Sequence, residues 1–89
     1  MDKQSIMRVI QDRVESSKNA DYAVWRIGLT HDTKDRYHYW KNPQRWLEWE
    51  VNSLSDAQDI ESYFINTMGM QGGTGGDLTT GRHIWVYVF

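Results

Sequence analysis

A basic and aromatic segment over residues 34–45 carries the residue types best suited to binding phosphates and bases. It holds four lysine or arginine residues against one aspartate, with tyrosine, histidine and tryptophan between them. Cations attract phosphates, and aromatic rings stack on unpaired bases. With Arg26 added from the preceding segment, the candidate nucleic-acid-binding residues are Arg26, Lys34, Tyr37, His38, Lys41 and Arg45. The alternative is a helix with an aromatic core face and a solvated basic face, because Tyr37 and Trp40 are three residues apart.

Glu61 is a second candidate because it falls within an apolar helical stripe. Its neighbours on the helical wheel are Ala57, Ile60, Phe64 and Ile65. A carboxylate drawn toward a core costs several kcal/mol unless it is paired or binds a cation. Glu61 therefore indicates a cation site, a structural ion pair with Arg26 or Arg36, or a position at the edge of the stripe that reaches water.

Three histidines and a glycine-rich loop carry weaker signals. His31, His38 and His83 lack the thiol partners and the spacing typical of zinc sites. The loop over residues 72–76 offers backbone N–H groups to a phosphate but lacks the Gly-Lys-Ser/Thr ending of a P-loop. Its alternative interpretation is a simple connection before the last strand.

Hydrophobic periodicity predicts the elements that position these residues. Helices are expected over residues 3–17, 33–41 and 55–68, and strands over 22–30, 45–51 and 84–89. Ser55 with Gln58 matches a capping box at the start of the third helix. In the last strand, alternation sets three aliphatic residues against Trp85, Tyr87 and Phe89. The short connections favour an α+β fold with a small mixed or antiparallel three-stranded sheet packed with about three helices.

Length and composition fit a single domain over residues 1–89. The chain has no cysteine, so disulfides and thiolate zinc sites are excluded and the core must hold by packing alone. Aromatic residues make up 13% of the chain, and such large rings bury much area per residue. A small core of this kind needs that contribution.

Charge and hydropathy narrow the classes of function. The net charge of −2 is not typical of a protein that binds nucleic acid regardless of sequence. Mean hydropathy is −0.72, and the longest apolar run is residues 84–89, so we expect no membrane segment and no membrane partner. Residues 1–4 lack the apolar core of a signal peptide. The simplest expectation is a cytoplasmic protein.

The order of the motifs resembles the GIY-YIG endonuclease superfamily. Ile27-Gly28 lies in a strand, a turn containing Asp32 follows, and Arg36 comes eight residues after the glycine. Glu61 lies on a later helix, as an essential glutamate does in that family. Over residues 22–68, the resemblance implies that Arg36 contacts the phosphate and that Glu61 binds Mg²⁺ or Mn²⁺. It also implies a tyrosine that assists the nucleophile.

The sequence departs from this family in two places. Arg26 stands where the family has the tyrosine of its second motif, and no Gly-Ile-Tyr strand precedes it. One hypothesis places the strand over residues 84–89 in the position of the missing strand, with Tyr87 near Arg36. Tyr22 is the other candidate tyrosine. Only Arg36 and Glu61 match the family position by position.

Two classes of function follow from these observations. The first is a GIY-YIG-like domain with degenerate chemistry that binds nucleic acid or a protein. It is favoured by the acidic balance, the replacement at Arg26 and the small size. By weak analogy, the size also fits a phage-type accessory or anti-defence protein. The alternative is a minimal endonuclease that cleaves DNA phosphodiester bonds with a divalent metal. The oligomeric state is left open.

Overall fold

A computed structural model describes residues 2–18, 20–73 and 83–89. Its helices are α1 (Lys3–Glu15), α2 (Thr33–Tyr39) and α3 (Leu54–Ser62). A short 3-10 turn, η1 (Tyr22–Val24), precedes the first strand, and a π-helical segment, η2 (Tyr63–Thr67), directly continues α3. Its strands are β1 (Ile27–Thr30), β2 (Leu47–Val51) and β3 (Ile84–Val88). These elements confirm the predicted α+β class. Most of the glycine-rich loop predicted over residues 72–76 lies outside the described residues.

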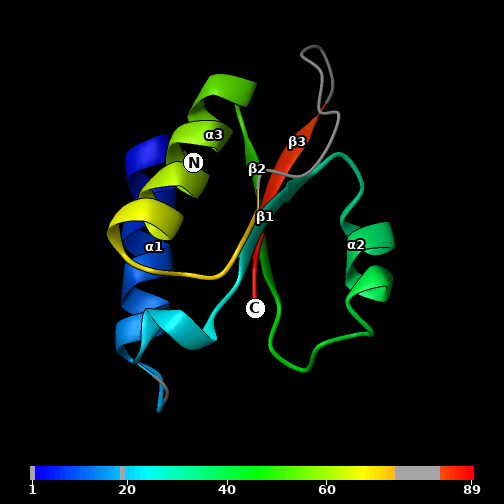
Figure 1. Cartoon of the computed structure of the whole chain (residues 1–89). Coiled ribbons are helices and arrows are strands. Elements are labelled where there is room, and N and C mark those ends of the chain that lie inside the picture. Colours follow the sequence, from blue (N-terminus) through cyan, green and yellow to red (C-terminus); the bar gives the residue numbers. More distant parts are fainter. Residues whose placement is uncertain (1, 19, 74–82) are drawn as a thin grey trace.

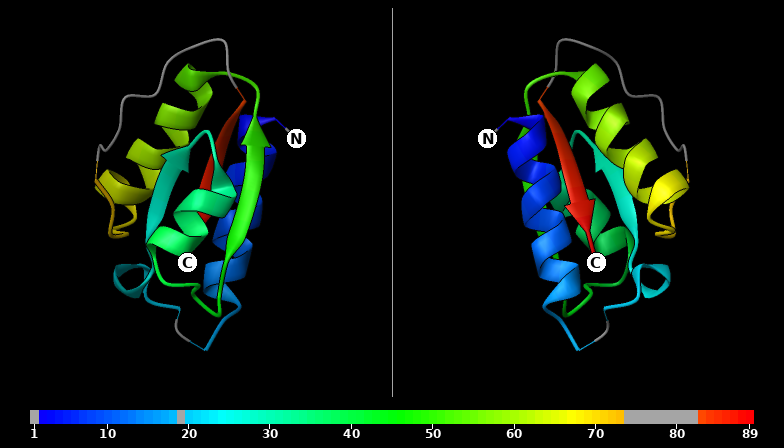
Figure 2. Two further views of the ribbon diagram at one scale, coloured as in Figure 1. Left: turned by 90° about the vertical axis from the view of Figure 1, so that its right-hand side faces the viewer. Right: turned by 90° about the vertical axis from the view of Figure 1, so that its left-hand side faces the viewer.

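The three strands form one antiparallel sheet in the order β1-β3-β2. The strand latest in the sequence is therefore the central one, as Figure 2 shows from two sides. In the register, Gly28 of β1 and Glu48 of β2 both lie opposite Tyr87 of β3. Because paired residues point to the same face, these three residues share one face of the sheet.

The opposite face of the sheet carries the hydrophobic core. Helices α1 and α3 lie side by side on this face, whereas α2 lies on the other (Figure 1). The helices contribute residues that are fully buried: Ile6, Ile10, Val14, Ala57 and Ile60. The strands contribute Ile27, Val51, Ile84, Val86 and Val88, each at most 5% exposed. The predicted alternation of β3 is confirmed, because its aliphatic residues occupy one face of the sheet and its rings the other.

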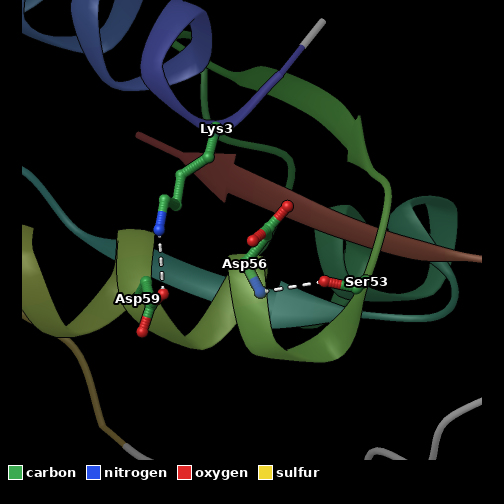
Figure 3. A network of polar contacts seen from close by, with 4 residues as sticks. All are labelled: Lys3, Ser53, Asp56 and Asp59. Carbon is green, nitrogen blue, oxygen red and sulfur yellow. Dashed lines mark hydrogen bonds and ion pairs between the residues drawn. The ribbon is translucent and has the colours of Figure 1, made fainter.

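A polar contact near the start of α1 and a cap at the start of α3 accompany this packing (Figure 3). Lys3 Nζ lies 3.0 Å from Asp59 Oδ2 across the two helices. Ser53 has an extended backbone, and its side chain accepts a hydrogen bond of 3.1 Å from the Asp56 amide. The capping box predicted at Ser55 is therefore wrong, because α3 begins at Leu54 and Ser55 already lies inside the first turn.

Two other predicted boundaries were wrong. The strand expected over residues 22–30 begins only at Ile27, because the Asp21 side chain accepts from the Ala23 amide and starts the turn η1. The helix expected to continue to residue 41 ends at Tyr39. Lys41 and Asn42 both adopt positive φ, at 64° and 54°, which α-helical backbone does not allow.

Helix α2 differs from α1 and α3 because it has no buried residue. Asp32 caps it through a 3.0 Å hydrogen bond from the Asp35 amide. No helix in the described part of the chain is long and apolar enough to cross a membrane.

Candidate functional site

Aromatic rings cover the face of the sheet that carries α2. The Trp46 ring stacks on Tyr87 at a centroid distance of 4.9 Å and an interplanar angle of 7°, and on Phe89 at 5.4 Å and 21°. Tyr87 and Phe89 are two residues apart on one face of the sheet, so both lie against the same side of the indole. The half-buried Trp46 ring therefore turns its other side away from the sheet.

Gly28 is what allows Tyr87 to lie flat across the sheet. A Cβ atom at Gly28 would come within 2.3 Å of Cζ and of the hydroxyl oxygen of Tyr87. The ring thus occupies the space that a side chain on β1 would need. The Tyr87 hydroxyl accepts a 3.2 Å hydrogen bond from Trp40 Nε1, which ties the sheet to the end of α2.

Three arginines lie over aromatic rings on or beside this face. The Cζ atom of Arg26 is 4.6 Å from the ring centroid of Trp40, and that of Arg36 is 5.0 Å from Tyr39. Arg26 also donates to Gln71 Oε1 at 3.1 Å. Arg26, one of the predicted nucleic-acid-binding residues, is thus engaged in contacts within the chain.

Arg45 serves packing more than binding. Its Cζ atom lies 3.4 Å from the ring centroid of Trp25, and its Nη2 donates to the Val24 carbonyl at 3.2 Å. Burial lowers the pKa of the guanidinium from its ordinary value. Among the described residues, its Nε has no hydrogen-bond partner. The predicted binding residues Arg26 and Arg45 are thus held by neighbours, whereas Lys34, His38 and Lys41 are exposed.

An open pocket of about 330 Å³ lies between α2 and β2. Its lining residues are Thr33, Lys34, Tyr37, Trp46 and Glu48. The Tyr37 ring meets the Trp46 ring edge-on, at 5.2 Å and 81°. Trp46 Nε1 donates to Glu48 Oε1 at 2.9 Å, which fixes the carboxylate beside the indole. The pocket thus combines two perpendicular aromatic walls with one positive and one negative group.

Arg36 and Glu61 belong to helices on opposite faces of the sheet (Figure 1). Glu61 is 7% exposed. Burial raises its pKa to about 7. Among the described residues, its carboxylate has neither a hydrogen bond nor an ion pair, so the predicted pairing with Arg26 or Arg36 is not observed. The structure does not bring together the two residues that match the GIY-YIG pattern.

Neither candidate tyrosine joins these two residues. Tyr22 packs against Phe64, and its hydroxyl donates to Glu15 Oε2 at 2.7 Å. Burial and the Glu15 carboxylate raise the pKa of Tyr22 above its ordinary value. Tyr87 lies on the α2 face, but it is 5% exposed and its hydroxyl is engaged by Trp40. A tyrosine in either position is poorly placed to act on a water molecule.

The Mg²⁺ or Mn²⁺ ion expected at Glu61 stays a prediction. Such ions require several oxygen ligands in octahedral geometry, usually from more than one group. The described residues contain no group of three or more histidine, aspartate or glutamate side chains that could hold a metal.

The three histidines make local contacts. His38 Nδ1 lies 2.7 Å from Asn42 Oδ1, beside the turn that ends α2. His83 pairs with Glu50, and His31 Nδ1 lies 2.8 Å from the His83 carbonyl oxygen. The contacts of His83 and His31 link the neighbouring ends of β1, β2 and β3.

No known protein family, curated protein or solved structure matches the chain. The resemblance to GIY-YIG endonucleases therefore stays a prediction. Of the pocket residues, the sequence pattern selected Lys34 and Tyr37 as binding residues but missed Thr33, Trp46 and Glu48. The signal available for Glu48 was its place beside Trp46 on the polar side of an alternating strand.

Proposed function

We propose that this chain is a non-catalytic module that binds single-stranded nucleic acid on its α2 face. The observation that supports the proposal most directly is the pocket between α2 and β2, where Trp46 presents one free side beside Tyr37 and Lys34. An aromatic platform next to a cation is the arrangement by which proteins stack an unpaired base and attract its phosphate.

A single strand suits this site better than a duplex. Bases in a duplex are stacked on one another, so only an unpaired base can reach an aromatic wall. Lys34 and Lys41 are exposed on and just after α2, where they can meet phosphates on either side of that base. The net charge of −2 predicts modest affinity that salt weakens readily.

Catalysis is not part of this proposal, because the geometry of the candidate catalytic residues argues against it. The sheet separates Arg36 from Glu61, and Tyr87 is buried with its hydroxyl occupied. Hydrolysis of a phosphodiester requires its charge-stabilising groups and its base to meet at one phosphorus atom. A GIY-YIG-like scaffold without that convergence retains binding alone.

Fluorescence anisotropy with labelled single- and double-stranded oligonucleotides of mixed sequence tests the proposal. We expect the single strand to bind more tightly, with a slope of log affinity against log salt of about −1.4, equivalent to about two phosphate contacts. The double variant Lys34→Gln/Lys41→Gln should flatten this slope. Lys18→Gln, which removes a cation after α1, should leave it unchanged.

Two results would overturn the proposal. Absence of binding to either oligonucleotide at low salt would leave a protein as the partner. Cleavage of the oligonucleotides with Mg²⁺ or Mn²⁺, lost in both Arg36→Ala and Glu61→Ala, would instead show the endonuclease.

A further inference from the structure

The pocket between α2 and β2 offers more than a stacking surface, because its polar groups are complementary to one base. Resting on the proposed function, we infer that this pocket is a guanine site. Glu48 supplies hydrogen-bond acceptors beside the rings of Tyr37 and Trp46, and Lys34 lines the same pocket. The pocket volume of about 330 Å³ is at the small end of the range for organic ligands, which suits a single base.

The Glu48 carboxylate is fixed before any ligand arrives. Trp46 Nε1 donates to its Oε1 at 2.9 Å, and the indole itself is held by stacking on Tyr87 and Phe89. Oε2 makes no hydrogen bond to the described residues, and Oε1 keeps a second lone pair. A carboxylate fixed in this way selects a ligand edge that carries two adjacent donors.

Guanine is the base whose pairing edge matches this arrangement. Its N1–H and N2–H₂ groups are adjacent donors that a single carboxylate can accept from together. Cytosine and adenine offer the carboxylate one amino group each. Uracil and thymine set carbonyl oxygens on both sides of their single N–H, so they would meet Glu48 with repulsion.

A cationic side chain of a protein partner is the competing occupant, because two rings and a carboxylate also attract ammonium groups. The presence of Lys34 argues against a cationic occupant. Lys34 lines the same pocket, and its positive charge would repel a second cation but attract the phosphate of a nucleotide.

The test uses heptamers of thymidine with one central position changed to guanine, cytosine, adenine or thymine. We expect the guanine heptamer to bind roughly tenfold more tightly than the all-thymine heptamer. Glu48→Gln should abolish this preference, because the amide can no longer accept from both guanine donors. Glu50→Gln is the matched control, since Glu50 lies on the same strand face but pairs with His83 outside the pocket.

A second readout locates the base. In a titration with guanosine monophosphate, the indole N–H resonance of Trp46 should shift in the native chain and in Glu50→Gln, and the same shift in Glu48→Gln should need roughly tenfold more ligand. A far-UV circular dichroism spectrum shows that each variant is folded.

The failures are distinguishable from one another. Equal binding of all four heptamers, or a preference that Glu48→Gln leaves intact, overturns the guanine site and leaves single-strand binding standing. No binding of any heptamer overturns the proposed function itself. A Trp46 resonance that responds to an arginine-containing peptide, and not to guanosine monophosphate, overturns the guanine site in favour of a cation.

Discussion

The two faces of the sheet are built from different residue types and pack differently. The face under α1 and α3 is lined by aliphatic side chains such as Val86 and Val88, which are fully buried. The face under α2 is lined by rings and by carboxylates, and Trp46 and Phe89 stay partly exposed. One face of this small sheet is therefore closed by aliphatic packing, whereas the other keeps part of its aromatic surface exposed to solvent.

The rings suit the exposed face for a physical reason. Tryptophan and tyrosine combine a large apolar area with a polar group, so they can pack on one side and still face water on the other. The indole N–H groups of Trp40 and Trp46 both find acceptors on this face, at Tyr87 and Glu48. An aliphatic residue in the same place would have no such partner.

The largest effect is expected from Gly28→Ala, which tests how rigid the aromatic face is. The added Cβ would overlap the Tyr87 ring, which is fixed below Trp46 and by the Trp40 hydrogen bond. We expect the free energy of unfolding to fall by about 3 kcal/mol. Denaturant unfolding monitored by circular dichroism measures this loss.

A double-mutant cycle with Tyr87→Leu separates the clash from the intrinsic effect of alanine. In the Tyr87→Leu background, Gly28→Ala should cost less than about 1 kcal/mol, since the ring is gone. Equal costs in both backgrounds would show that the Tyr87 ring moves aside for the added methyl group. The aromatic face would then not be rigid.

The next effect comes from Glu61→Gln on the aliphatic face. The folded-state pKa of Glu61 is raised to about 7, so the folded protein binds this proton more tightly than the unfolded chain does. Binding of this proton stabilises the folded protein fully at acid pH, and this stabilisation is lost as pH rises from 4.5 to 7. We expect Glu61→Gln to raise the free energy of unfolding at pH 8 by about 2 kcal/mol.

Unfolding midpoints measured from pH 4 to pH 8 check the sign of this effect. The native chain is expected to become less stable as pH rises over that range, and the variant should lose this decline. Glu48→Gln removes the same charge from the exposed face and should keep the decline. A Glu61→Gln variant that is less stable at pH 8 would show that the native carboxylate has a partner that stabilises its charge.

The smallest effect is expected at the start of α3, from Ser53→Ala. This change removes the side-chain acceptor of the Asp56 amide and should cost about 1 kcal/mol (Figure 3). Ser55→Ala, at the position that the sequence pattern favoured, should cost almost nothing. Thermal unfolding of the two variants side by side ranks them, and the reverse ranking would contradict the observed cap.

Strand alternation made much of the fold predictable. The pattern of β3 sets Ile84, Val86 and Val88 against Trp85, Tyr87 and Phe89, and the structure keeps that division. The cap of α3 was harder to predict, because Ser53 and Ser55 both precede acceptable first-turn residues. Only the end of β2, where Ser53 is still extended, selects one of them.

The candidate site was less predictable, since it depends on which face each helix covers. Periodicity places Arg36 and Glu61 on helices but does not say that α2 and α3 lie on opposite faces. The faces follow from the strand order, in which β3 separates β1 from β2 and the connection between them carries α2 across the sheet. Pairing between distant segments is not visible in a local pattern.

The central position of β3 has a consequence for the order of folding. β1 and β2 each pair with β3 and are kept apart by it, so neither has its sheet partner until residues 84–88 have been synthesised. During translation, the helices can form before the sheet, because the sheet lacks its central strand until then. The rings of α2 and of Trp46 stay exposed over that interval, and both faces of the sheet close only once this five-residue strand has appeared.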